Sequence, residues 1–363
     1  MFFGKKKTNM ETEIVEQTKI IPYILSQYID HETGEIKLNL PQNIRKIVLV
    51  ASGSSYHCAR FAVELVEKIS KIESRAIYSN EFLLKTLIPH DENTLYIFIT
   101  QSGETSDTIK AAERVKKETQ LPALCITNKI DSTIWKICDY QVACHAGVEQ
   151  GIAATKSFTS QMLCLILISL KLIENAEPED VTRSYKESLK HLPEIVDSAI
   201  SKRNEIRKFA HHIAKEDVVI LTAEGISYSL AKEGALKIKE TSYKNISAAI
   251  LGEFMHGHVA VLNNKKSTLA FISVAEISER SVSNLNKIKS DYNPTIAVIG
   301  INDDRIKPDY HIMVECNNEI QQLFANVVIL QLTALETALK LRRNVDHPKG
   351  LHKIVTDSKE VNH

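Results

Sequence analysis

The chain has 363 residues, of which 44% are hydrophobic and 25% charged, and its 45 basic and 45 acidic residues give a formal net charge of +0 at pH 7. This composition is typical of a globular protein long enough for two domains. The even charge balance argues against a nucleic-acid partner or an anionic membrane surface, because binding to either usually requires a basic excess.

The N-terminus and the most apolar run carry no signal for export or membrane insertion. The opening MFFGKKKTN has neither an apolar core after its lysines nor a cleavage site, so we expect no signal peptide. The run MLCLILISL (162–170) is shorter than the ~20 apolar residues of a membrane span, which predicts a buried helix. The six cysteines form no C-x-x-C pair, which favours reduced core thiols in a cytoplasmic protein over disulfides or a metal site.

Apolar runs of strand length alternate with helical patterns along the chain. Six runs have the composition of buried strands: KIVLVA (46–51), LYIFIT (95–100), PALCIT (122–127), DVVILT (217–222), STLAFIS (267–273) and TIAVIG (295–300). A charged helical stretch (174–205) connects the two halves. Fully apolar strands that alternate with helices form parallel sheets covered on both faces, so we expect an α/β fold.

The two halves also resemble each other. With a shift of 172 residues, Gly53 aligns with Gly225, and Ser55, Tyr56 and Ala59 align with identical residues. A chance match of short glycine–serine turns is the alternative. A duplication predicts two tandem doubly wound parallel-sheet domains of flavodoxin-like type, with ligands at the carboxyl ends of the strands. The expected ranges are 1–40 for an N-terminal helical segment, 41–185 and 205–345 for the two domains, and 346–363 for a C-terminal tail.

Two strands of the first half run into turns rich in hydroxyl groups. The turns ASGSSYH (51–57) and TQSGETSDT (100–108) each follow a strand and begin a helix, where backbone N–H groups and the helix dipole favour an anion. Neither turn matches a dinucleotide or triphosphate motif. Hydroxyls without a P-loop lysine suit one phosphate monoester, and Gln101 is then able to contact a sugar hydroxyl. The alternative is that these residues only cap helices.

Three charged residues of AKEGALKIKE are predicted to share a helix face. Glu233, Lys237 and Glu240 are spaced i, i+4 and i+7. One interpretation is an exposed Glu–Lys pair worth about 0.3–0.5 kcal/mol. The other is catalytic, because moving a proton between adjacent sugar carbons needs a carboxylate base and a cation near the oxygen that gains charge.

Six ordered motifs extend these patterns from Glu13 to Thr356. They are SGSSYH, QSGETSDT, EQGIAATKSFTSQ (149–161), AKEGALKIKETSY (231–243), GEFMHGH (252–258) and DHPKGLHKIVT (346–356). Together they resemble the sugar isomerase (SIS) domain family, and in particular the isomerase portion of glucosamine-6-phosphate synthase and its single-module relatives. The resemblance implies an enzyme that acts on a phosphorylated sugar without a metal or a cofactor.

The resemblance also implies which residues bind the substrate. The phosphate and the sugar hydroxyls are expected to contact Ser54, Ser55, Thr100, Gln101, Ser102 and Thr105. Ile152 and Ala154 are expected to line the sugar. The second half has SVAEISE (273–279) where the first has TQSGET, so we expect one phosphate site, in the first half.

Five further residues receive catalytic roles from the resemblance. Glu240 is expected to carry the proton, Lys237 to stabilise the oxyanion, and Glu233 to orient the lysine or the substrate. His256 is expected to open the sugar ring from a partner subunit, which predicts a homodimer. Lys353 is expected to form an imine with the ketose carbonyl, an assignment that rests wholly on the resemblance.

The chain departs from the family pattern at four places. Ala51, Ala154 and His258 replace a cysteine, a serine and a proline, and the tail beyond Lys353 is longer than in the synthases. The chain also enters the isomerase module almost at once. We therefore expect that it does not release ammonia from glutamine by itself.

Three functions agree with these features. The first is a glucosamine-6-phosphate deaminase, which couples aldose–ketose isomerisation to loss of ammonia. The sequence AATKSF and the expected lack of a glutaminase portion favour this function. The second is synthesis of glucosamine 6-phosphate from free ammonia or with a separate glutaminase chain, together with related deglycases of sugar–amino-acid phosphates. The third is a non-catalytic phosphosugar sensor, against which the joint presence of the five catalytic residues argues.

Overall fold

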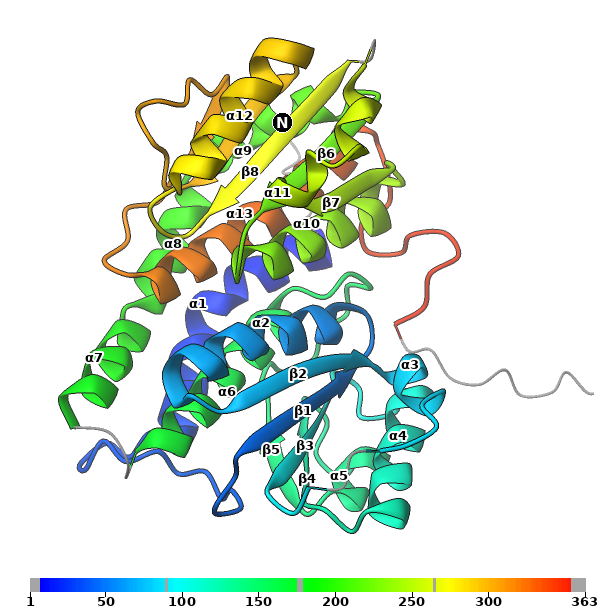
Figure 1. Cartoon of the computed structure of the whole chain (residues 1–363), viewed down its shortest axis with the longest axis vertical. Coiled ribbons are helices and arrows are strands. Elements are labelled where there is room, and N and C mark those ends of the chain that lie inside the picture. The colour runs from blue at the N-terminus through cyan, green and yellow to red at the C-terminus, as the bar shows by residue number, and fades with distance from the viewer. Residues whose placement is uncertain (1–6, 89–90, 175–178, 264–265, 354–363) are drawn as a thin grey trace, which may run out of the picture. The chain divides into compact units, whose positions relative to one another are not determined.

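A computed structural model describes residues 7–88, 91–174, 179–263 and 266–353 of the chain. These residues form two compact units that are discontinuous in sequence, each built around one five-stranded parallel sheet (Figure 1). The first-sheet unit comprises residues 20–149, 156–186 and 352–353, and the second-sheet unit comprises residues 7–19, 150–155 and 187–351. Helix α1 (Asn9–Tyr28) contributes to both units. Of the expected tail, residues 354–363 lie outside the described part of the chain.

The first-sheet unit has the strand order β2-β1-β3-β4-β5, the flavodoxin-like order of a doubly wound fold. Its strands are β1 (Lys46–Ala51), β2 (Glu73–Tyr78), β3 (Thr94–Thr100), β4 (Ala123–Thr127) and β5 (Tyr140–Ala143). Helices cover both faces: α2 (Gly53–Ser70) and α6 (Lys156–Ile173) on one, and α3 (Ser79–Leu83), α4 (Ser106–Glu118) and α5 (Thr133–Ile137) on the other (Figure 1). β1, β3 and β4 are buried almost throughout, as their apolar sequences predict.

The second-sheet unit repeats this topology with the order β10-β9-β8-β6-β7. Its strands are β6 (Val218–Ala223), β7 (Ile246–Ile250), β8 (Ser267–Ser273), β9 (Thr295–Gly300) and β10 (Tyr310–Ile312). Its helices are α8 (Leu192–Ser201), α9 (Arg203–Ile213), α10 (Ser227–Ser242), α11 (Leu251–Phe254), the 3-10 helix η1 (His258–Leu262), α12 (Glu279–Tyr292) and α13 (Glu319–Lys340), while α7 (Glu179–Lys190) leads in from the first-sheet unit. The first strand of each sheet lies between the second and the third, which confirms the predicted pair of doubly wound α/β domains.

Two helices are unusually apolar. By length and composition alone, α6 and α13 are long and apolar enough to cross a membrane. In the structure, however, 89% and 94% of their most apolar 18-residue stretches are buried. The run at 162–170 therefore forms part of a buried helix, as its length predicts. Five of the six cysteines are also buried, and Cys316 is half-buried.

Candidate functional site

The two hydroxyl-rich turns lie side by side at the carboxyl edge of the first sheet. β1 pairs with β3 in parallel, with Ala51 opposite Ile99, so the turns that follow the two strands are neighbours. The first turn continues into α2, which contains Ser54 and Ser55, and the second leads into α4. The sheet register therefore brings the six expected phosphate-binding residues to two adjacent helix N-termini.

Neither turn is an ordinary helix cap. Ser52 and Thr105 hold the N-cap positions of α2 and α4, yet neither side chain makes a capping hydrogen bond. The Thr105 hydroxyl instead pairs with the Thr100 hydroxyl at 2.7 Å, and the Ser102 hydroxyl accepts the Glu104 backbone N–H at 3.1 Å. This arrangement leaves the first turn of each helix without its usual side-chain acceptor. The capping bonds that the alternative interpretation predicts are thus absent at both turns.

The glycine of the second turn, Gly103, allows its backbone to lie close to the Ser132 side chain. Gly103 has φ +69°, and a Cβ atom on it would lie 2.0 Å from the Ser132 hydroxyl. Its carbonyl accepts the Ile134 backbone N–H at 3.2 Å, while the Glu104 carboxylate accepts the Thr133 N–H and hydroxyl. These contacts tie the turn to the start of α5, so the turn is pre-formed and its acidic side chain is engaged there.

The corresponding turn of the second sheet is built differently. Helix α12 is capped by Ser278, whose hydroxyl accepts the Ser281 N–H at 3.2 Å. The Glu224 carboxylate, which aligns with Ser52 under the 172-residue shift, accepts hydrogen bonds from both serine hydroxyls. A fixed carboxylate at this helix N-terminus supplies the negative charge that an anion would bring. This observation agrees with the expectation of a single phosphate site, in the first half.

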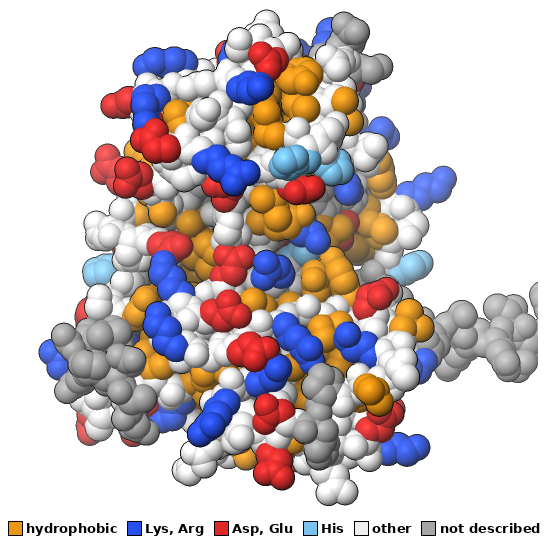
Figure 2. Space-filling view, in the orientation of Figure 1, with side chains coloured by type: hydrophobic (Ala, Val, Ile, Leu, Met, Phe, Trp, Pro, Cys, Tyr) orange, Lys and Arg blue, Asp and Glu red, His pale blue; other side chains and the backbone are white. Residues whose placement is uncertain are grey.

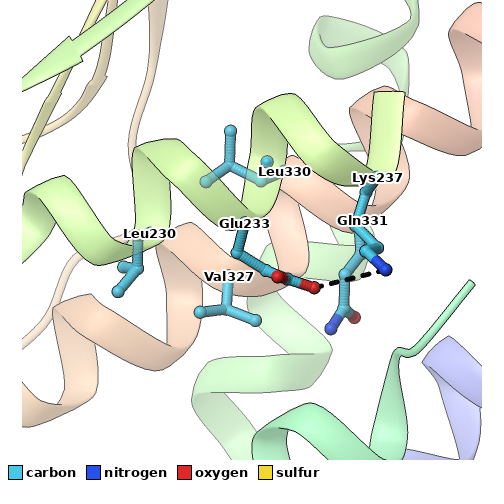
Figure 3. A pocket seen from close by; sticks show the side chains of 7 residues that line it. Leu230, Glu233, Lys237, Val327, Leu330 and Gln331 are labelled. Carbon is cyan, nitrogen blue, oxygen red and sulfur yellow. Dashed lines mark ion pairs between the residues drawn. The ribbon is translucent and has the colours of Figure 1, made fainter. Parts of the chain in front are cut away.

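The charged face of α10 is buried. Glu233 and Lys237 are 4% and 2% exposed, and the Lys237 Nζ atom lies 3.4 Å from Glu233 and 2.5 Å from Glu240. Glu240 is more accessible, with 23% of its side chain exposed. Glu233 and Lys237 also line a small cavity between α10 and α13, together with Leu230, Gly234, Val327, Leu330 and Gln331 (Figure 3). The interpretation of Glu233 and Lys237 as a solvated surface pair is therefore wrong, because packing against α13 removes these groups from water.

A buried amine between two carboxylates has a specific chemical use. Its charge compensates the carboxylates, and a buried ammonium is a strong donor to an oxygen that gains negative charge. Glu240, at the accessible end of the set, is the member best placed to exchange a proton with a ligand. The structure thus brings the three residues together, and their catalytic roles stay predictions.

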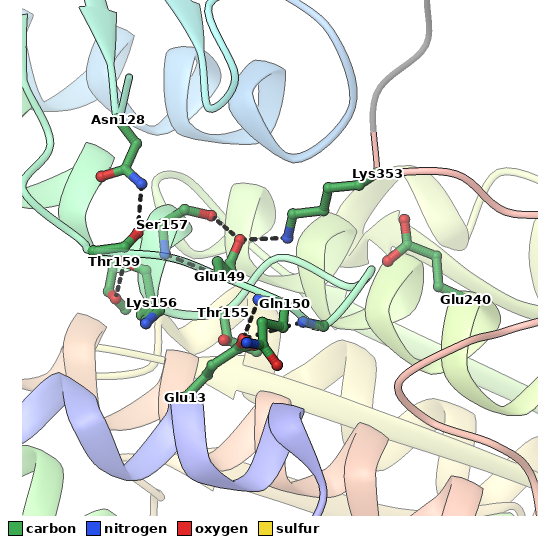
Figure 4. Close-up of polar contacts among 12 residues, drawn as sticks. Glu13, Asn128, Glu149, Gln150, Thr155, Lys156, Ser157, Thr159, Glu240 and Lys353 are labelled. Atoms are coloured by element: carbon green, nitrogen blue, oxygen red, sulfur yellow. Dashed lines mark hydrogen bonds and ion pairs between the residues drawn. The ribbon is translucent and has the colours of Figure 1, made fainter. Parts of the chain in front are cut away.

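Lys353 is engaged in an ion pair rather than solvated. Its Nζ atom lies 2.6 Å from the Glu149 carboxylate, which is fully buried (Figure 4). The same carboxylate accepts the Ser157 N–H at 3.1 Å and the Ser157 hydroxyl at 2.7 Å. Glu149 belongs to the motif EQGIAATKSFTSQ, but the sequence alone does not predict this contact, because Lys353 lies 204 residues away.

The remaining expected residues belong to the second-sheet unit. Ile152 and Ala154 are partly exposed on the segment 150–155, and Glu233, Lys237 and Glu240 fall in the same unit. His256 lies between α11 and η1 and is exposed, as are Ile250 at 43% and Val261 at 48%. Figure 2 shows histidine side chains next to apolar ones over the α11 region. The phosphate-binding residues and Lys353 fall in the first-sheet unit.

Comparisons with known proteins agree with this architecture. A family model described as SIS domain matches residues 42–170 and 212–341, which is most of both halves. A glutamine–fructose-6-phosphate aminotransferase [isomerizing] from Methanosarcina mazei is 31% identical over 358 residues, covering 96% of this chain and 58% of the relative. The chain thus spans less than two thirds of that relative's length.

Solved structures extend the similarity. The C-terminal domain of glucosamine-fructose-6-phosphate aminotransferase from Francisella tularensis superposes with a TM-score of 0.86 at 26% identity, covering 94% of this chain and 99% of that one. A glucosamine-6-phosphate deaminase from Thermotoga maritima superposes with a TM-score of 0.76 at 21% identity, covering 96% and 99%. The second similarity concerns the fold alone.

Proposed function

The chain belongs to the SIS domain family, and we propose that it is an enzyme that interconverts glucosamine 6-phosphate and fructose 6-phosphate. The observation that carries this proposal is the buried Glu233–Lys237–Glu240 set on α10. A protein that only binds a sugar has no need of a buried amine held between two carboxylates, whereas an aldose–ketose isomerase does. The relatives named as isomerizing aminotransferases support the same reaction class.

The proposed chemistry moves one proton and exchanges one amine. Glu240 takes a proton from one sugar carbon and returns it to the adjacent carbon, while Lys237 donates to the oxygen that gains charge. In the direction of deamination, glucosamine 6-phosphate and water give fructose 6-phosphate and ammonia. Isomerisation leaves the substrate nitrogen as an imine at C-2. Lys353 adds to that carbon and ammonia leaves, so that the carbon is held as an imine of Lys353. Water then adds to this imine and releases fructose 6-phosphate and the lysine amine. The reverse reaction, amination of fructose 6-phosphate, is the alternative direction, and the relatives' names favour it.

The test of this function is an assay in both directions. The purified protein is incubated with glucosamine 6-phosphate, and ammonia and fructose 6-phosphate are measured; the reverse assay uses fructose 6-phosphate with ammonium or with glutamine. Product in either direction supports the proposal, and the faster direction identifies the reaction. Tight binding of both sugars without conversion would favour the sensor instead.

The phosphate is proposed to bind at the turns after β1 and β3. Replacing Ser102 and Thr105 by alanine should raise the KM for the phosphosugar strongly, because hydrogen bonds to a charged group are worth about 1.5–3 kcal/mol each. Steady-state kinetics on the double variant give this value, and circular dichroism reports whether the fold survives. The matched control replaces Ser278 and Ser281 in the second sheet, which should cost stability but leave KM unchanged. An unchanged KM in the Ser102 and Thr105 variant would mean that these hydroxyls serve only the fold.

The active form is proposed to be a cytoplasmic homodimer in which His256 completes the partner's site. Exposed apolar residues on both sides of His256 in the sequence, Ile250 and Val261, support a covered surface there. Mixing inactive Glu240→Gln and His256→Ala chains under conditions of subunit exchange should restore part of the activity. Light scattering of the wild type should show a dimer, and a fully active monomer would contradict the shared site.

A further inference from the structure

The segment 150–155 is anchored at both ends by buried side chains of its own unit. At its start, a Glu13 carboxylate oxygen on α1 accepts the backbone N–H groups of Gln150 at 2.5 Å and Gly151 at 3.0 Å (Figure 4). At its end, the Gln331 amide on α13 donates to the Thr155 carbonyl at 3.2 Å. Two helices far apart in sequence therefore determine the path of six residues.

The two anchors are connected to each other. Gln17, one turn after Glu13 on α1, donates from Nε2 to the Gln331 Oε1 atom at 2.8 Å, and both glutamines are almost fully buried. Buried amides that lose a partner are costly, so this pair keeps Gln331 in one orientation, with its donor toward Thr155.

Gly151 makes room for the first anchor. A Cβ atom at this position would lie 2.8 Å from the second carboxylate oxygen of Glu13. The glycine has an ordinary φ, so its role here is the close approach of the carboxylate to the backbone. The carboxylate and the glycine thus form one matched contact.

Gln331 also lines the cavity beside the acid–base residues. Its side chain faces the space bounded by Glu233 and Lys237, as Figure 3 shows. The Gln331 side chain therefore lines the cavity next to the Lys237 amine. It also holds the end of the segment that contains Ile152 and Ala154. The sequence alone predicts no role for Glu13, Gln17 or Gln331, the three side chains that anchor the segment.

We propose that Gln331 is a positioning residue for substrate selectivity: oriented by Gln17, it binds Thr155 and so sets the distance between the 150–155 segment and the Glu233–Lys237–Glu240 set. This inference rests on the proposed function, in which Ile152 and Ala154 contact the sugar. A segment fixed by two buried anchors presents one surface to the sugar carbons. Loss of one anchor lets the segment adapt, so epimers that it normally rejects are accepted.

The test compares kcat/KM for glucosamine 6-phosphate with the values for its C-2 and C-4 epimers. Gln331→Met removes both hydrogen bonds at similar volume and should reduce the selectivity by about fivefold, the equilibrium equivalent of one neutral hydrogen bond. Gln17→Met should act in the same direction but more weakly. The double variant should be no less selective than Gln331→Met, because Gln17 acts through Gln331.

The matched control is Gln322→Met on the same helix. Gln322 is equally buried but bonds to Asn326 at 3.0 Å, so its loss should lower stability without changing selectivity. Equal selectivity of Gln331→Met and wild type, or an equal change in Gln322→Met, would overturn the positioning role. A wild type that converts no phosphosugar at all would instead overturn the proposed function, and this inference with it.

Discussion

Glu240→Gln is expected to lower turnover by about 10²–10⁴-fold, the usual contribution of a positioned general base. Glutamine keeps the shape of the side chain and an oxygen that can accept from Lys237, which lies 2.5 Å from the carboxylate. Binding of fructose 6-phosphate should therefore stay near the wild-type value. The measurement is kcat in the isomerisation assay together with solvent deuterium incorporation, which the wild type should show at least in part and the variant should not.

The control for this prediction is an ion pair of the same spacing on an exposed helix. Glu187 and Lys190 on α7 are also separated by three residues and 2.5 Å, but both side chains are more than half exposed. Glu187→Gln should leave turnover unchanged. Full turnover of Glu240→Gln on every sugar phosphate that the wild type converts would remove Glu240 from the mechanism.

The strands that the sequence predicts and those that it misses differ in one physical respect. All six predicted strands occupy interior positions of the two sheets. In each of them, every residue or every residue but one is buried. The four missed strands, β2, β5, β7 and β10, are the four sheet edges. An edge strand has one solvent-facing side and fewer buried positions, as in the β7 sequence ISAAI, so it lacks the continuous apolar run that marks a central strand.

The candidate site likewise has features that the sequence predicts and features that it does not. The helix face of α10 is predictable because i, i+4 and i+7 spacing is a local property. Its burial is not, because it depends on α13, about 90 residues later in the chain. Likewise, the partners of Glu149 and Gln331 lie 204 and 176 residues away, so no local pattern points to either contact. In the sequence alone, Glu149 and Gln331 cannot be distinguished from ordinary polar residues.

Lys353 is the second position at which a large effect is expected. An amine that attacks a ketose carbonyl must first lose a proton, and the Glu149 carboxylate at 2.6 Å is placed to accept it. Ser157 holds that carboxylate through its N–H and its hydroxyl, so the acceptor does not have to reorganise. The pair therefore holds the amine in a fixed place beside a fully buried carboxylate, whereas in a surface ion pair neither partner would be fully buried.

Lys353→Met should reduce ammonia release by a factor of about 10² or more, because the residue that we propose forms the covalent intermediate is lost. Solvent exchange of the sugar hydrogen should persist, since we propose that Glu240 rather than Lys353 moves that proton. Glu149→Gln should give an intermediate loss in the same assay, because the amine keeps its place but loses its proton acceptor. Lys349→Met, at an exposed lysine of the same tail, should match the wild type. Normal ammonia release by Lys353→Met would exclude an imine at this lysine, and parallel loss of both activities would mean that Lys353 serves binding or folding instead.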